Sequence, residues 1–216
     1  MIEFPYKKVL GIIGEDRAGK DTVAKYLQET RNFVPYAFAD KIKEEFGISK
    51  EDFEAAKIAG NIEELRQKLW NFSAAKKEKD TLYFIRKVIN DVILAEKSAI
   101  ITDIRTIDEL HAFFDMDNGF HVKRLYLIKT GEEQPDNNGN FQGTKLSYNL
   151  LSSLISDNKI RTLNNNNDGL FDFLCRLDKF FFNEDILDLA GFGYDMSGKK
   201  DTMLSYLSQF DISKRK

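Results

Sequence analysis

The spacing of apolar residues along the chain predicts five short strands separated by helical segments. The strands are expected at residues 9–13, within 33–39, and at 98–103, 122–129 and 159–163. Short runs rich in Val, Ile and Leu are typical of strands that are buried on both faces. Pro35 is awkward inside a strand, so the second strand is expected in the C-terminal half of its run.

The segments between the strands show the apolar spacing of helices. Residues 40–96 show only helical periodicity, clearest after Asp80, a plausible N-cap, in the apolar face formed by Leu82, Ile85, Val88, Ile89, Val92 and Ile93. Another strongly apolar helix is expected at residues 168–182. Strands that alternate with helices imply right-handed crossovers and a parallel sheet covered on both faces. The pattern therefore predicts an α/β fold: a three-layer sandwich around a five-stranded parallel sheet.

The same pattern divides the chain into a main domain and an appendage. We expect the main domain at residues 1–182, with a helical insertion at about 41–96, and a helical appendage at 183–216. Residues 130–145 are rich in Gly, Asn and Gln, too polar for the core and long for a simple connection. We interpret this last segment as a mobile flap.

Composition narrows the function classes. The formal net charge of −3 disfavours an extended nucleic-acid-binding surface, although the chain ends in a basic SKRK sequence. Cys175 is the single cysteine, which excludes an internal disulfide framework and fits a reducing compartment. We find no signal-peptide pattern and no apolar run near the roughly 20 residues of a membrane span. We therefore expect a cytoplasmic protein, and whether it forms a homodimer stays open.

The stretch GIIGEDRAGKDTVAKYL at residues 11–27 contains a phosphate-binding pattern. Gly14 is followed by four residues and then by Gly19 and Lys20, between a predicted buried strand and an amphipathic helix. The glycines allow backbone N–H groups to turn toward a phosphate, and the helix adds the positive end of its dipole. Lys20 is expected to neutralise the β- and γ-phosphates of ATP. The expected ATP-binding residues in this loop are Gly14, Asp16, Ala18, Gly19, Lys20, Asp21 and Thr22.

A second match, at Gly193–Lys199, lacks this context. No strand precedes it, and Lys200 stands where the pattern requires a hydroxyl residue. We assign it no function.

The residue after Lys20 departs from the usual pattern. Ser or Thr normally follows the lysine and meets Mg²⁺ through its hydroxyl, whereas here Asp21 follows and Thr22 comes one position later. Asp also favours the first turn of a helix because of the helix dipole. Both groups offer the oxygen ligands that Mg²⁺ prefers, so we favour a magnesium role for Asp21 and Thr22 over the dipole interpretation.

The stretch GEDRAGKDTVAKYL resembles the phosphate loop of bacteriophage-type deoxynucleoside monophosphate kinases, in which Gly-Lys-Asp-Thr is the usual form. That family stands within a wider nucleoside-monophosphate-kinase-like group that includes dephospho-coenzyme A kinase and phosphomevalonate kinase. Three later stretches match in the same order: YAFADKIKEEF, AIITDIRTIDEL and LNNNNDGLFDFL. The resemblance spans residues 7–182 and implies that the predicted α/β sandwich is a P-loop fold. It also implies magnesium-assisted transfer of the ATP γ-phosphoryl to a nucleoside or deoxynucleoside monophosphate.

Within this resemblance, each remaining candidate residue has a functional and a structural interpretation. Asp103 ends a buried strand, where it would reach Mg²⁺ or instead cap the helix that starts at TIDEL. Arg105 would bind a transferring phosphate or form an ion pair with Asp108 or Glu109. Both interpretations stay open for each residue.

The acceptor and adenine sites are less defined. Lys43 and Arg66 would contact the acceptor or form ordinary pairs on helix surfaces, and Asn167 would lie near the adenine or form a turn and N-cap. The flap contains no arginine, unlike the lids of this group, and Lys145 is its cation. Two alternatives follow: a kinase for another small phosphorylated metabolite, or an ATPase or ATP-binding module coupled to nucleic-acid handling.

Overall fold

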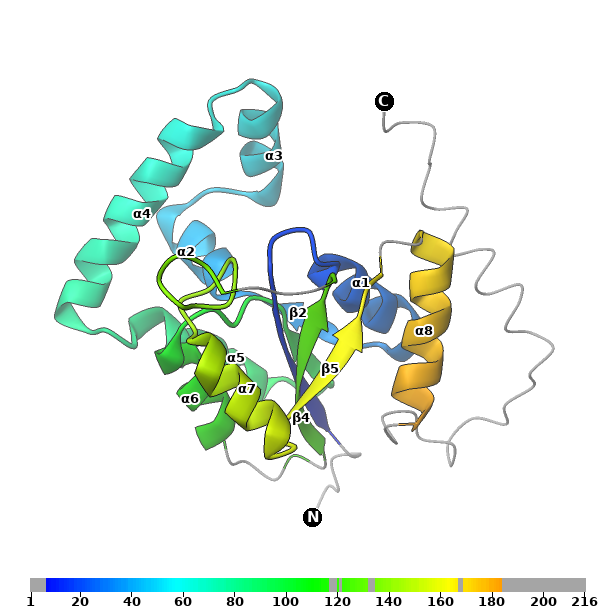
Figure 1. The fold of residues 1–216 in the computed structure, drawn as a ribbon. Coiled ribbons are helices and arrows are strands. Elements are labelled where there is room, and N and C mark those ends of the chain that lie inside the picture. The colour runs from blue at the N-terminus through cyan, green and yellow to red at the C-terminus, as the bar shows by residue number, and fades with distance from the viewer. Residues whose placement is uncertain (1–6, 117–119, 121, 132–134, 167–168, 184–216) are drawn as a thin grey trace, which may run out of the picture. The chain divides into compact units, whose positions relative to one another are not determined.

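The computed structural model describes residues 7–116, 120, 122–131, 135–166 and 169–183 (Figure 1). The chain divides into two compact units, residues 1–166 and 167–216. In the second unit, the described part is helix α8 (Leu170–Asn183), near the position that the apolar pattern predicts. The expected appendage lies outside the described residues beyond Asn183.

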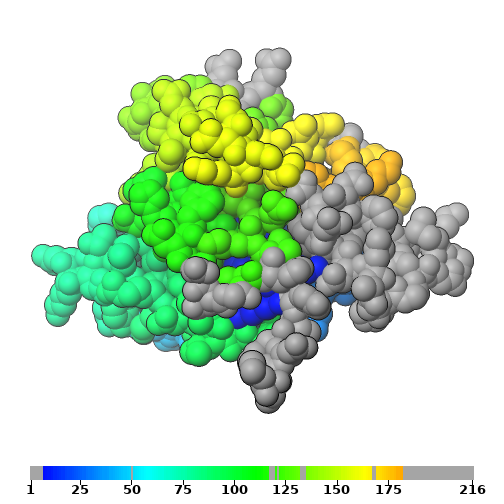
Figure 2. All heavy atoms as spheres, turned by 90° about the horizontal axis from the view of Figure 1, so that it is seen from below, coloured from blue at the N-terminus to red at the C-terminus, as the bar shows by residue number. Residues whose placement is uncertain are grey.

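The first unit is built on five parallel strands in the order β2-β3-β1-β4-β5. The strands are β1 (Lys8–Gly14), β2 (Val34–Tyr36), β3 (Ala99–Ile101), β4 (Val122–Lys129) and β5 (Ile160–Asn164). Every residue of β1 is buried, as expected for a central strand. In the view of Figure 2, blue atoms of the N-terminal segment show in a small area bordered by green and grey atoms. The predicted α/β fold with a five-stranded parallel sheet is confirmed.

Helices cover both faces of this sheet. They are α1 (Lys20–Arg31), α2 (Phe38–Phe46), α3 (Lys50–Ile58), α4 (Ile62–Lys79), α5 (Tyr83–Leu94), α6 (Ile107–Asp115) and α7 (Tyr148–Ser156). Apolar residues of α5, α6 and α7 form one core with β1, β3, β4 and β5, and α1 lies on the other side of the sheet (Figure 1). None of the helices in the described ranges is long and apolar enough to span a membrane.

Helices α2, α4 and α5 are joined by one carboxylate. Glu45 of α2 accepts hydrogen bonds from Lys76 of α4 at 2.6 Å and from Lys87 and Tyr83 of α5 at 2.5 and 2.8 Å. The hydrogen bonds from Lys76 and Lys87 lower the pKa of Glu45 to about 2. This cluster fixes the helical region that the periodicity of residues 40–96 predicts.

Three expectations about local structure are wrong. Strand β2 is centred on Pro35 rather than placed after it, because β2 is an edge strand with a single neighbour and can tolerate the missing N–H. Helix α5 has Leu82 at its N-cap, although the Asp80 side chain accepts a hydrogen bond from the Leu82 N–H at 3.1 Å. The polar segment 130–145 was expected to lie outside the core, but its residue Phe141 is buried in the core. Helix α7, which follows that segment, was not expected.

Gly11 lies in β1 at a point where α6 packs closely against the sheet. A Cβ atom at this position would lie 2.7 Å from Leu125, 2.8 Å from Ile104 and 2.8 Å from Phe113. All three neighbours are buried, so they cannot move into solvent to make room. Glycine at the centre of β1 therefore lets α6 approach the sheet.

We predict that Gly11→Val destabilises the protein by about 1–3 kcal/mol, because the added carbons overpack a dense core. The free energy of unfolding from urea denaturation measures this. Ala55→Leu is the matched control, since it also adds three carbon atoms but lies on the exposed surface of α3. Equal stability of Gly11→Val and the unsubstituted protein would contradict the packing described here.

Candidate functional site

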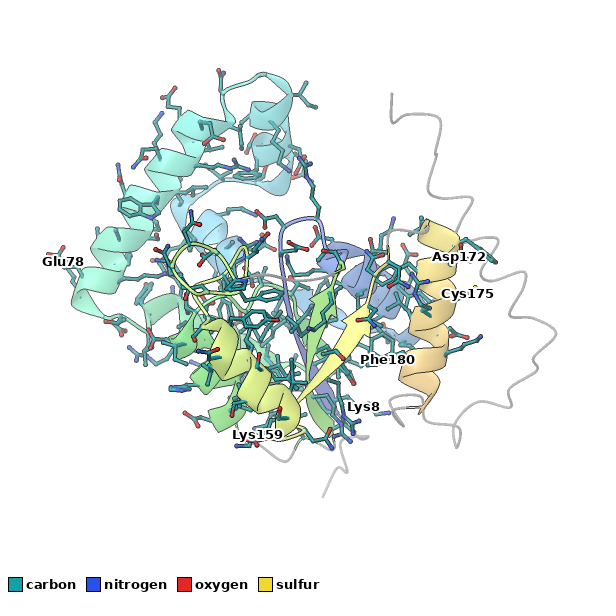
Figure 3. The ribbon with its side chains drawn as sticks, in the orientation of Figure 1. Lys8, Glu78, Lys159, Asp172, Cys175 and Phe180 are labelled. Atoms are coloured by element: carbon teal, nitrogen blue, oxygen red, sulfur yellow. The ribbon has the colours of Figure 1, made fainter. Side chains whose placement is uncertain are left out.

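The carboxyl ends of the strands form the edge at which the candidate residues gather. Strands β1, β3, β4 and β5 are parallel, so Gly14, Ile101, Lys129 and Asn164 end at the same edge. Lys8, which begins β1, and Lys159, which precedes β5, lie at the opposite end (Figure 3). Open α/β sheets bind ligands at the carboxyl edge.

The candidate phosphate loop, residues 15–19 and called the phosphate loop below, connects β1 to α1 through two residues in the left-handed region. Arg17 has φ 66° and Gly19 has φ 98°, and Gly19 is the N-cap of α1. Ala18 donates its N–H to the Glu15 carbonyl at 3.2 Å, which closes the turn. The first N–H groups of a helix have no acceptor within it. A left-handed turn that leads into a helix N-terminus is therefore suited to an anion.

Gly14 contributes less to this turn than the pattern implies. Its φ is negative, and an added Cβ would meet Ala18 and Ile128 only at 3.4 Å, an ordinary contact distance. Arg17 has a left-handed backbone conformation that the glycine pattern does not reveal. The turn thus depends on Arg17 and Gly19.

Lys20 lies across the start of the phosphate loop. Its Nζ donates to the carbonyls of Gly14 at 2.7 Å and Glu15 at 2.6 Å, and its side chain is buried. Burial lowers the pKa of Lys20 and the charge of Arg105 lowers it further, whereas three carboxylates oppose this. The ammonium group is therefore already at the loop, held by neutral carbonyls.

The three carboxylates that act on Lys20 are those of Asp16, Asp21 and Asp103. Together with Arg105 they place four predicted site residues close enough to Lys20 to affect its titration. The structure thus brings Lys20, Asp16, Asp21, Asp103 and Arg105 together at the carboxyl edge.

Arg105 pairs with the phosphate loop rather than with α6, the helix that follows it. Its guanidinium lies 3.2 Å from the Asp16 carboxylate. This ion pair takes the place of the pair with Asp108 or Glu109 that the sequence left open. Glu109 instead accepts the backbone N–H groups of Arg105 and Thr106 at 2.8 and 2.9 Å, as part of a capping box that starts α6. The cap fixes the backbone of Arg105, while its side chain reaches residue 16.

Asp103 contacts the start of α2, whereas the sequence analysis considered it as a cap for the helix at TIDEL, which is α6. Its two oxygens accept the backbone N–H groups of Phe38 and Ala39, at 2.9 and 3.2 Å, at the start of α2. Burial raises the pKa of Asp103 to about 6, with a contribution from Glu109, against the effect of the two N–H donors and Arg105. The Asp103 carboxyl group therefore changes its protonation state at a pH of about 6, close to neutrality.

The oxygen groups in this region fit a magnesium ion that arrives with a nucleotide. Asp21 is exposed on the first turn of α1, and the Thr22 hydroxyl belongs to the same turn. The described ranges contain no cluster of three or more His, Cys, Asp or Glu side chains that could hold a metal alone. Mg²⁺ typically binds one or two carboxylates together with substrate phosphates and water, so a preformed cage is not required.

Other candidates lie elsewhere in the fold. Lys43 of α2 pairs with Asp40 at 2.6 Å and lies over the Phe53 ring at 4.7 Å. Arg66 of α4 pairs with Glu63 at 2.6 Å. In the described part of the chain, neither side chain pairs with a residue of the phosphate loop. Asn167 lies outside the described residues.

Three residues that the sequence did not reveal contact the phosphate loop. Asn165, after β5, donates from Nδ2 to the Ala18 carbonyl at 3.0 Å. Thr130, after β4, donates its hydroxyl to the Glu15 carboxylate. A Cβ on Gly143 would lie 3.2 Å from the backbone nitrogen of Asp16. Two of these are polar residues directly after a strand, a signal that could have identified them.

The pKa of Asp103 leads to a stability prediction. A carboxyl group whose pKa is higher in the folded than in the unfolded state stabilises the fold when it is protonated. That stability is present below about pH 4 and is lost as the pH rises through about 6. We expect the unfolding free energy of the protein, relative to Asp103→Asn, to fall by about 1–3 kcal/mol between pH 4 and pH 7.

Urea denaturation across this pH range measures the difference. Asp157→Asn is the control, because Asp157 is an exposed carboxylate at the end of α7, and it should keep the original pH dependence. Parallel stability curves for Asp103→Asn and the unsubstituted protein would show that Asp103 does not titrate as described.

Comparison with known proteins gives one family. The model for the phosphomevalonate kinase family matches residues 12–118, a region that includes the phosphate loop, Lys20, Asp103 and Arg105. No curated protein matches the chain. Phosphomevalonate kinases stand in the wider kinase group that the sequence resembles, but the match does not confirm the bacteriophage nucleotide kinase assignment. It supports an ATP-dependent phosphotransferase.

Proposed function

We propose that this protein transfers the γ-phosphoryl group of ATP to the phosphate of a nucleoside or deoxynucleoside monophosphate. The observation that carries the proposal is the meeting of Lys20, Arg105 and the left-handed phosphate loop at the carboxyl edge of the sheet. The Gly-Lys-Asp-Thr sequence at residues 19–22 favours nucleotides as the acceptor class. The match to a kinase family supports phosphoryl transfer as the reaction.

Both cations of the site are held by contacts that a phosphate can replace. Lys20 donates to two neutral carbonyls, and Arg105 pairs with an Asp16 side chain that is 75% exposed. Hydrogen bonds between a cation and a phosphate are stronger than those to a neutral carbonyl. Arrival of the triphosphate would therefore transfer Lys20 to the β- and γ-phosphates and Arg105 to the transferred group.

The transfer requires positioning and charge neutralisation rather than a protein nucleophile. An oxygen of the acceptor phosphate forms the new bond to the γ-phosphorus, and the bond to the bridging β–γ oxygen breaks, which leaves ADP. Asp21, Thr22 and Asp103 would hold Mg²⁺, which supplies charge neutralisation on the phosphates when bound. Arg105 would orient the group in transfer.

We assign the acceptor site to residues of the helices that precede β3. Lys43 lies over the ring of Phe53, so a positive charge and an aromatic face occur together, a combination that suits the phosphate and base of a nucleotide. Lys43 is half-buried and Arg66 is exposed. We assign both to acceptor binding, with Lys43 on the phosphate.

A second acceptor class is favoured by the family match. The match is to phosphomevalonate kinases, so a phosphorylated metabolite without a base is the alternative substrate. In that case the same loop and cations would hold ATP, and only the acceptor would differ. The two substrate classes are separated by direct assay.

We predict that the purified protein forms ADP with one acceptor of a panel of nucleoside monophosphates, deoxynucleoside monophosphates and phosphomevalonate. Lys20→Ala should lower kcat/KM by at least about a hundredfold, because one positioned charge on the transferring group is lost. Coupled detection of ADP, with the phosphorylated product identified by mass spectrometry, measures this.

Lys25→Ala is the matched control, since Lys25 lies on the same helix and pairs with Glu29 at 3.8 Å on the surface. It should keep the original rate. Full activity of Lys20→Ala would refute the assignment of the loop. ADP formation without any phosphorylated acceptor, stimulated by DNA or RNA, would favour the ATPase alternative, and ATP binding without turnover would favour a binding module.

A further inference from the structure

The phosphate loop contains strain that neighbouring residues must oppose. Arg17 has φ 66°, in the left-handed region that residues with a Cβ seldom adopt. Such a conformation persists only where surrounding contacts impose it. The contacts that flank Arg17 are therefore expected to determine whether the loop keeps its shape.

Residues on both sides of Arg17 are held from outside the loop. Thr130 donates to the Glu15 carboxylate before it, and Asn165 donates to the Ala18 carbonyl after it, at 3.0 Å. Gly143, at φ 72°, lies so close to the backbone of Asp16 that any side chain there would be tight. All three belong to segments that follow β4 or β5, so these segments fix the connection between β1 and α1.

The hydrogen bond from Asn165 also sets the direction of a backbone donor. In a planar trans peptide the C=O and N–H groups point in opposite directions. When Asn165 fixes the Ala18 carbonyl, it therefore fixes the N–H of Gly19 on the other side of the same peptide plane. Gly19 is the N-cap of α1, and its N–H is one of the donors that the phosphate loop offers to an anion.

The backbone of Asn165 is itself anchored. Its N–H donates to the Lys129 carbonyl at 2.7 Å, which extends the pairing of β4 and β5 past Asn164. The side chain therefore starts from a rigid position at the edge of the sheet. Rigid support of this kind is what a positioning residue needs.

We propose that Asn165 is a positioning residue for the phosphate loop: with Thr130, it holds the strained turn at Arg17 in the shape that binds a triphosphate. This inference rests on the proposed function, because it assumes that the loop binds phosphates. It assigns Asn165 no contact with the ligand. Its effect should therefore follow the phosphates and be independent of the base.

The test compares binding of MgATP and of inorganic tripolyphosphate to the full-length protein by isothermal titration calorimetry. Asn165→Leu, similar in size but without the donor, should bind both ligands about fivefold more weakly, because the hydrogen bond to the Ala18 carbonyl is lost. Asn164→Leu is the matched control, since Asn164 is exposed at the end of β5, and it should bind both ligands as before. Thermal unfolding verifies that each variant is folded, and Thr130→Val, with the same expected loss, is used if Asn165→Leu is not.

The strain at Arg17 supplies a second measurement. Glycine adopts positive φ at little cost, so in an Arg17→Gly background the loop should need less support. There, the additional substitution Asn165→Leu should change either affinity by less than about twofold, well below its effect beside Arg17. An undiminished effect would overturn the proposal.

The remaining outcomes separate this inference from the proposed function. If the unsubstituted protein binds neither ligand, the proposed function and the role of Asn165 are both refuted. If it binds both and Asn165→Leu binds them equally well, the proposed function stands and the role of Asn165 is refuted. A loss for MgATP without a loss for tripolyphosphate would assign Asn165 to the base and would also overturn the proposal.

Discussion

Backbone N–H groups at the end of β1 can converge on an anion only if the chain turns sharply before α1 begins. Two residues in the left-handed region, Arg17 and Gly19, make that turn. One of them carries a side chain, so the turn is strained and depends on neighbours after β4 and β5 for its shape. The rest of the site is arranged around this short connection.

The lysines of the protein illustrate how similar contacts serve different ends. Lys7 and Lys123 donate to carbonyls at the C-terminal ends of α5 and α6, where positive charge offsets the helix dipole. Lys20 also donates to backbone carbonyls, but these belong to the strained loop at the carboxyl edge of the sheet. The contacts of Lys7 and Lys123 stabilise the ends of helices, whereas the contacts of Lys20 place an ammonium group where a phosphate is expected.

Asp103 connects the two sides of the site. Its carboxyl group binds the start of α2, which leads into the helices proposed to receive the acceptor, and its charge acts on Lys20 in the proposed donor site. A carboxylate has lone pairs beyond those that accept two N–H groups, so the structural contact leaves capacity for a cation. The observed contact with the start of α2 and the proposed role as a magnesium ligand are therefore compatible.

The sequence by itself determined the number of strands and the class of the fold. Buried strands and amphipathic helices are set by local periodicity, so the five-stranded parallel sheet and the connection from β1 to α1 were predicted close to their observed positions. Tertiary structure alone decided what the periodicity does not encode. Pro35 is accepted because β2 lies at an edge, Phe141 is buried within a polar segment, and Arg105 pairs with Asp16. Each of these depends on a neighbour distant in sequence, as does the bond from Asn165 to Ala18. Spacing along one chain cannot specify such contacts, because they arise only when separate strands end at the same edge of a sheet.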